Sequence, residues 1–137
     1  MFTETEIAYL RTQRLGRIAT TSKIGQPDVA PVVFDFDGTH FYVPGLELQR
    51  TLKFKNIQDN PRVAFVVDDL QSVDPWTPRG IRVHGTADAI PHRSRFGAGT
   101  YIRIIPRKKY VWGIDEPAII DGKPNIKRQH TAARTSE

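Results

Sequence analysis

The chain has no cysteine, which excludes a disulfide framework and thiolate chemistry. It also has no apolar run long enough to span a bilayer. The first six residues lack the basic and apolar regions of a secretory signal peptide, so a cytoplasmic location and no membrane partner are expected. At 137 residues one domain is expected, with residues 1–120 as its body and 121–137 as a polar tail without periodicity.

Residue patterns typical of hydrolases and metalloenzymes are missing as well. No pair of carboxylates suggests acid–base catalysis of the glycosidase type. No serine lies in a Gly-x-Ser-x-Gly motif. The histidines fall at no spacing that metal ligands use; they are His40, His84, His92 and His130. The sequence therefore predicts no metal site and identifies no catalytic residue.

What the chain does have is positive charge. The formal net charge is +5 and the pI is about 9.7, which indicates an anionic partner. The tail contributes two of the five net charges, because it has four basic residues against two acidic ones. The folded part is therefore only mildly basic, which weakens a nucleic-acid interpretation.

Hydrophobic periodicity predicts a mainly β fold with two short helices. Thr3 and Glu6 form a capping box ahead of an expected helix near 4–13. Asp37-Gly38 predicts a hairpin that joins its two flanking strands. The expected strands are 15–21, 28–36, 39–43, 62–67, 80–89, 101–106 and 109–114. Six or seven strands with two helices favour a small barrel or a strongly bent sheet.

Two connections stand out in this pattern. The segment from Asp68 to Arg79 is expected to be a long loop, and Trp76 lies in it between Pro75 and Pro78. A tryptophan flanked by prolines in a connection suggests a rigid lid or an interface element. Residues 91–99 are polar and ambiguous, and Pro106-Arg107 predicts a break between the last two strands.

The most informative stretch is residues 50–63, a basic helix pattern between two strands. The start of a basic helix is a natural place to hold a phosphate. On a helical wheel Arg50 and Lys53 are neighbours, whereas Lys55 and Thr51 face elsewhere. The alternative is an ordinary helix with solvated lysines. Basic residues interleaved with aromatics also occur in single-strand nucleic-acid binders, but most phenylalanines here fit core alternation, so no nucleic-acid partner is expected.

Taken in order, these segments resemble the pyridoxamine 5′-phosphate oxidase-like split-barrel family of flavin and deazaflavin proteins. The resemblance runs from about Phe2 to Ile114. Its segments are Leu15–Thr21, Gly25–Pro27, Ala30–Val32, Lys53–Ile57, Asn60–Val63, Ile81–Ala87 and Ile102–Pro106. It implies the split β-barrel of FMN-binding proteins and a homodimer with two cofactor clefts at the subunit interface.

The small size is similar to that of the deazaflavin branch, which uses coenzyme F420. In relatives the cofactor phosphate is held around the position of Lys53, the ring stacks near Ala30–Val32, and the partner's loop, here 68–76, closes the cleft. The cofactor-binding residues that the resemblance implies are Ala30, Pro31, Val32, Arg50, Thr51, Lys53, Lys55, Asn56 and Trp76. Arg17, Lys23 and Arg79 are further cations of the expected cleft rim. No residues match the pyridoxal-phosphate site of the vitamin B6 enzymes.

The function that this resemblance implies is a PPOX-class, F420-dependent oxidoreductase. It would transfer a hydride between the deazaflavin and an electrophilic small molecule such as an activated alkene or a quinone. Two alternatives stay open. One is an FMN-dependent reductase or oxidase of the same fold, and the other is a non-enzymatic protein that binds a cofactor or haem.

Overall fold

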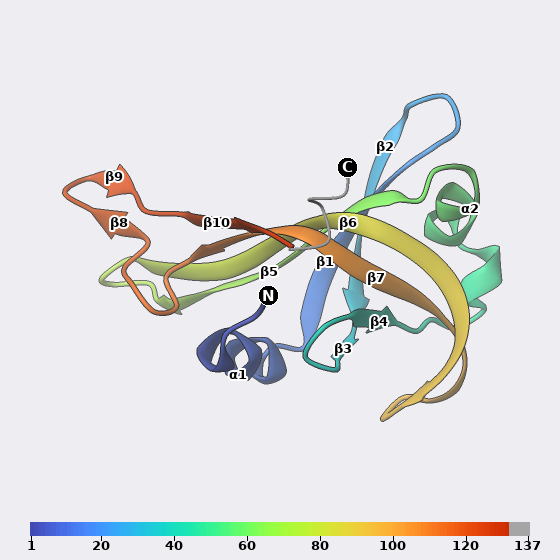
Figure 1. Ribbon diagram of the computed structural model, residues 1–137, viewed down its shortest axis with the longest axis horizontal. Helices are drawn as coiled ribbons and strands as arrows, with labels where there is room; N and C mark the ends of the chain where they lie inside the picture. The colour runs from blue at the N-terminus through green and yellow to red at the C-terminus, as the bar shows by residue number, and fades with distance from the viewer. Residues whose placement is uncertain (132–137) are drawn as a thin grey trace.

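The computed structural model describes residues 1–131, so tail residues 132–137 lie outside the described part. The architecture is one strongly bent antiparallel sheet with helices at its sides (Figure 1). The strand order is β2-β1-β5-β6-β7-β4-β3, and β10 pairs with the other side of β7. A separate two-stranded sheet pairs β8 with β9. The expectation of a mainly β fold, built as a small barrel or a strongly bent sheet, is confirmed.

The strands of the main sheet differ greatly in length. The longest are β5 (Arg62–Ser72), β6 (Thr77–Ser94) and β7 (Gly97–Trp112). The others are β1 (Leu15–Thr21), β2 (Pro27–Val33), β3 (Asp35–Phe36), β4 (Phe41–Val43) and β10 (Lys127–His130). β8 (Ile119–Ile120) and β9 (Lys123–Pro124) form the small sheet. Because β5–β6–β7 outrun their neighbours, they project as an arm at the left of Figure 1.

The helices are short. α1 (Glu4–Thr12) begins with the predicted capping box, in which Glu6 N donates to Thr3 Oγ1 and Thr3 N donates to Glu6 Oε1. A 3₁₀ turn, η1 (Leu48–Arg50), precedes α2 (Leu52–Asp59). Within residues 1–131 no helix reaches the length and hydropathy that crossing a membrane would take.

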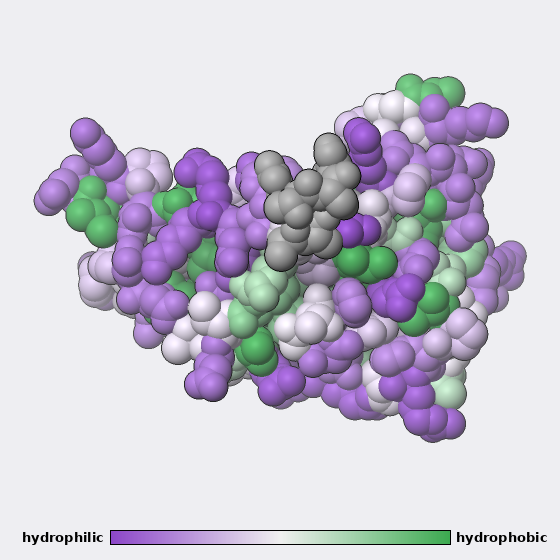
Figure 2. Space-filling view, in the orientation of Figure 1, coloured by the Kyte–Doolittle hydropathy of each residue, from purple (hydrophilic) through white to green (hydrophobic). Residues whose placement is uncertain are grey.

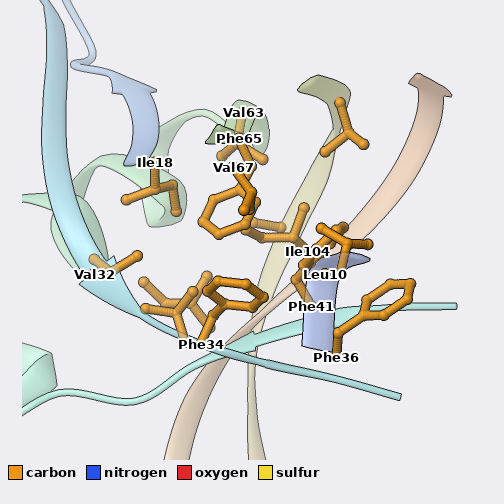
Figure 3. Packing of buried hydrophobic residues seen from close by; sticks show 14 of the residues in the cluster. Leu10, Ile18, Val32, Phe34, Phe36, Phe41, Val63, Phe65, Val67 and Ile104 are labelled. Carbon is orange, nitrogen blue, oxygen red and sulfur yellow. The ribbon is translucent and has the colours of Figure 1, made fainter. Parts of the chain in front are cut away.

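The core lies on the concave side of the sheet. Figure 3 shows aromatic rings converging there, with Phe34 from the β2–β3 connection, Phe41 from β4 and Phe65 from β5 at the centre. The centroids of the Phe34 and Phe65 rings lie 5.4 Å apart in an edge-to-face arrangement. α1 packs against this core through Tyr9 and Leu10. The buried ammonium group of Lys109 donates to the Glu6 carboxylate on α1 and to the Met1 carbonyl oxygen. The assignment of these phenylalanines to core alternation is confirmed.

Two sequence expectations about connections are wrong. Residues 68–79 form no long loop, because β5 and β6 continue to a tight turn at 73–76. Residues 91–99 belong to the β6–β7 hairpin, and the expected break at Pro106 is a register shift opposite His84 and Gly85 within a continuous β7. The tail also contains strand β10, paired with β7 from Lys127 to His130. Long-range pairing explains each case, since β-strands extend wherever a neighbour supplies hydrogen bonds.

The second expected strand also divides. β2 ends at Val33 and pairs with β1, whereas β3 begins at Asp35 and pairs with β4. The turn between β3 and β4 covers residues 37–40, longer than the two-residue hairpin expected from Asp37-Gly38. The Asp37 carboxylate explains this length, because Oδ1 accepts hydrogen bonds from the backbone N–H groups of Thr39 and His40, at 2.8 and 2.7 Å.

Candidate functional site

The side of the sheet away from the core, here called the outer face, carries the polar and small side chains of β1, β5, β6 and β7. Strand register places Arg17 beside Val66, Val66 beside Arg82, and Arg82 beside Tyr110. The next row runs through Ala19, Ala64, His84 and Lys108. Residues far apart in the sequence therefore form one continuous surface.

A groove of about 780 Å³ lies on this outer face. Its floor is made of small side chains, among them Ala19, Ala64 and Thr86, over which a flat group can approach the sheet closely. The remaining lining residues are Thr20, Thr21, Pro27, Arg62, Val63, His84, Gly85 and Arg107. Among residues 1–131, two guanidinium groups and no carboxylate line the groove, so it suits a flat ligand with negative charge.

His84 is the lining side chain that titrates closest to neutral pH. Burial, followed by the charges of Arg82 and Lys108, lowers the pKa of His84 below its usual value near 6.5. The ring also meets the Tyr110 ring edge-to-face, with centroids 5.1 Å apart. A largely neutral imidazole at pH 7 can donate or accept a hydrogen bond in the groove.

Helix α2 adjoins the groove through a buried contact. Asn56 is 2% exposed, and its Nδ2 donates to Thr20 Oγ1 at 2.9 Å. Thr20 itself lines the groove, so this hydrogen bond fixes the helix to the strand that forms the groove's edge. Asn56 was predicted to bind the cofactor. In the structure its side chain is buried and links α2 to β1.

The start of α2 differs from the helical wheel that the sequence suggested. Thr51 has an extended backbone between η1 and α2, and its Oγ1 accepts from Phe54 N as the N-cap. Arg50 therefore belongs to a separate turn, where it pairs with Glu47 at 3.0 Å. The expectation that Arg50 and Lys53 share one helix face is wrong. Lys53 is half-buried and Lys55 is exposed, as their different positions on the wheel predict.

The predicted ring-stacking segment on β2 alternates between the two faces. Val32 is buried in the core and Ala30 packs against it. Pro31 alone faces outward, beside Arg17 on β1. Because β2 is an edge strand of the main sheet, one of its backbone edges has no strand partner among residues 1–131. Of this segment, only the Pro31 side chain and the backbone edge of β2 can therefore contact a ring on the outer face.

Two further cations of the predicted rim, Arg79 and Arg17, are engaged in ion pairs, as Arg50 is. Arg79 donates to both oxygens of Asp69, at 2.8 and 3.0 Å, and lies over the Tyr9 ring below α1. It is therefore absent from the outer-face rim, contrary to expectation. Arg17 does lie on the outer face, where it pairs with Asp68 at 2.9 Å.

Trp76 is 62% exposed and belongs to the turn at residues 73–76 between β5 and β6. That turn lies at the tip of the arm, at the opposite end of the molecule from α2 (Figure 1). It lines a cavity of about 400 Å³ between the β5–β6 turn and residues 113–119. Within one chain, Trp76 and Lys53 do not belong to the same site.

The groove residues Arg62, His84 and Arg107 were not singled out from the sequence as binding residues. Arg62 and His84 lie in strand-like segments and Arg107 lies at the predicted break. Their convergence depends on the pairing of β5 with β6 and of β6 with β7. The available signal was the alternation of outward-facing residues at 62, 64 and 66 and at 82, 84 and 86. That alternation shows which face a side chain takes, without showing its neighbour.

Comparison with known proteins identifies a matching family and a similar reductase. A family model described as pyridoxamine 5′-phosphate oxidase matches residues 2–113. The chain is 44% identical over 121 residues to a 5a,11a-dehydrotetracycline/5a,11a-dehydrooxytetracycline reductase of Streptomyces rimosus subsp. rimosus, covering 83% of this chain and 84% of the relative.

Solved structures agree in fold at lower identity. A conserved hypothetical protein of Mycobacterium tuberculosis superposes with a TM-score of 0.66 at 22% identity, covering 84% of this chain and 87% of that one. An F420 reductase superposes with a TM-score of 0.57 at 21% identity, covering 71% and 89%.

Proposed function

This chain belongs to the pyridoxamine 5′-phosphate oxidase family, and we propose that it is an oxidoreductase that uses coenzyme F420 to reduce an electrophilic small molecule. The oxidoreductase class follows from the family and from the 44% identical reductase. The cofactor and the substrate are the proposed parts.

The observation that carries the proposal is the outer-face groove. It combines a floor of small side chains with Arg62 and Arg107 at its edge, and Asn56 joins it to the basic helix α2. A deazaflavin presents a flat ring together with a phosphodiester and several carboxylates. Such a ligand is more anionic than FMN. A groove whose described lining has cations and no carboxylate therefore favours it.

Individual residues have distinct parts in this proposal. Lys53 provides a charge near the start of α2 for the phosphate, and the first N–H groups of the helix add to it. Thr51 fixes the helix start, and Pro31 with the β2 edge flanks the ring. When bound, the deazaflavin supplies a hydride, and the protein orients it and limits water around it. The proton for the product comes from solvent or from a side chain still to be identified.

The proposed substrate is a conjugated small molecule with an electron-poor double bond. The relative's name describes the reduction of a dehydro-tetracycline, that is, a ring system lacking hydrogens at positions 5a and 11a. A reducible carbon–carbon double bond in a polycyclic molecule is the substrate class that we extend to this chain.

We also propose that two chains associate through the outer face. Val29, Pro31 and Val33 alternate outward along the edge strand β2, and Leu15 lies beside Val33 on β1. Val29 is 66% exposed in the single chain. Exposed apolar side chains on an edge strand are commonly buried in a symmetric interface. Such an interface would bring the groove of each chain near the partner chain.

An absorption spectrum and a titration test the cofactor. The purified protein is titrated with coenzyme F420 and with FMN at 0.1 M and 1 M salt, between which the Debye length falls from about 10 Å to about 3 Å. We expect tighter F420 binding at low salt and a larger loss at high salt. Tighter FMN binding at low salt would replace the deazaflavin by a flavin, and a Soret band would indicate a haem protein.

A further inference from the structure

A second concave site lies where the C-terminal segment folds back over the arm. Its volume is about 310 Å³, and we call it the arm pocket. Its walls are Pro78, Arg82, Trp112, Ala118, Ile119, Pro124 and Ile126. Six of these seven side chains are apolar, and Arg82 provides the only charge among them. Figure 2 shows hydrophobic side chains over β8 and β9 at this end of the molecule.

The wall made by residues 113–126 is held in place by its own contacts. Gly113 has φ +71°, and a Cβ there would lie 2.1 Å from the Pro78 carbonyl oxygen, so glycine lets the chain leave β7 close to β6. Asn125 Nδ2 donates to Glu116 Oε2 and to the Pro117 carbonyl oxygen, both at 3.0 Å. Its backbone N–H donates to the Ala118 carbonyl at 2.7 Å. The pocket is therefore preformed.

The opposite wall presents a flat aromatic surface and a fixed hydrogen-bond donor. A Cβ on Gly80 would lie 2.4 Å from Cζ2 of Trp112, so the indole lies directly over this glycine. The Arg82 guanidinium carbon lies 4.2 Å from the centroid of the Tyr110 ring, which fixes its orientation. An indole face favours a planar conjugated ring, and a guanidinium group favours a carbonyl oxygen on that ring.

The arm pocket is adjacent to the groove along β6. Arg82 lines the pocket and His84 lines the groove, and the two residues are two positions apart on the same face of one strand. Such neighbours lie about 7 Å apart. A ligand of several fused rings is long enough to occupy the pocket and to reach the groove.

The wall segment also lies outside the part of the chain that the family model matches, because that match ends at residue 113. Ala118, Ile119, Pro124 and Ile126 belong to this additional segment. We propose that the arm pocket binds the substrate, a planar conjugated ring system carrying a carbonyl group, and directs its reducible bond toward the groove. This inference rests on the proposed reductase function and adds the place at which the substrate is recognised.

Tryptophan fluorescence tests the pocket without turnover. The chain has two tryptophans, so Trp76→Phe leaves Trp112 in the pocket wall as the single emitter. Tetracycline, a planar conjugated polycycle with carbonyl groups, serves as the probe in protein with and without coenzyme F420. We expect saturable quenching of Trp112, and binding that is about five- to ten-fold weaker in Ile119→Ala, because that side chain covers the ligand. Arg82→Gln should also weaken binding.

The matched control is Ile24→Ala, which removes an isoleucine that is 93% exposed in the turn between β1 and β2. It should bind tetracycline as the parent does. Normal coenzyme F420 binding without saturable quenching would overturn the pocket and leave the proposed function standing. Saturable quenching without coenzyme F420 binding would support the pocket and overturn the F420-dependent part of the proposed function. If Ile119→Ala changes only the molecular mass in light scattering, a second copy covers the pocket and the inference is wrong.

Discussion

The hydrogen bond from Asn56 Nδ2 to Thr20 Oγ1 joins helix α2 to the groove. Its removal should loosen the attachment of α2 to β1 and destabilise the fold. Both residues are 2% exposed, so neither polar group can turn to water when its partner is lost. Asn56→Ala removes one buried hydrogen bond, worth about 1 kcal/mol, and leaves the Thr20 hydroxyl without its donor, at a cost of about 1–3 kcal/mol. We therefore expect a loss of about 2–4 kcal/mol in the free energy of unfolding.

Equilibrium unfolding in urea, followed by tryptophan fluorescence, measures this loss. Thr20→Val keeps the side-chain volume and leaves the Asn56 amide unpaired, so it should cost about 1–3 kcal/mol. The double variant Thr20→Val/Asn56→Leu removes both partners and should be more stable than the sum of the single losses predicts, by about 1 kcal/mol or more. Additive losses, or a loss below about 0.5 kcal/mol for Asn56→Ala, would refute the reasoning.

Three further predictions concern the cofactor, the dimer and pH. Lys53→Ala should weaken coenzyme F420 binding about ten- to a hundred-fold by titration, whereas Lys55→Ala, on the other side of α2, should have less effect; equal losses would contradict the assignment. Val29→Asp should convert a dimer to a monomer in light scattering, whereas Ile24→Asp should not; an unchanged mass would exclude this face. The pKa of His84 is lowered in the folded state, mainly by burial, so the unfolded state binds protons more readily. Urea unfolding should therefore show parent stability falling more steeply than that of His84→Gln as pH drops below 6.5, and parallel curves would contradict this.

Local signals predicted the local parts of this fold. The capping box of Thr3 and Glu6 sets the start of α1, because a helix start depends on residues within one turn of the chain. Alternation in Leu15–Thr21 and Arg62–Val67 marked true strands, since side chains on a strand point to alternate faces. The same signal placed the phenylalanines in the core.

The errors arose where pairing between distant segments decides the outcome. Residues 68–79 contain Pro75 and Pro78 and read as a loop, yet β5 and β6 pair with each other as far as Ser72 and Thr77. The tail reads as irregular, yet β10 gains its hydrogen bonds from β7. In the predicted site, the basic segment of residues 50–55 suggested one continuous helix. The extended backbone of Thr51 instead separates Arg50 from Lys53.

The sequence by itself determined the mainly β class, the two short helices, the core phenylalanines and the segment that resembles a cofactor-phosphate site. Each of these depends on periodicity or on contacts a few residues apart. Only the tertiary structure decided that Ala19, Ala64 and His84 share one groove, that Asn56 is a buried link, and that residues 113–126 form a wall over Trp112. The physical reason is strand register. Side-chain alternation specifies a face of the sheet, whereas the neighbour across the sheet is specified by backbone hydrogen bonds between strands that lie far apart in the chain.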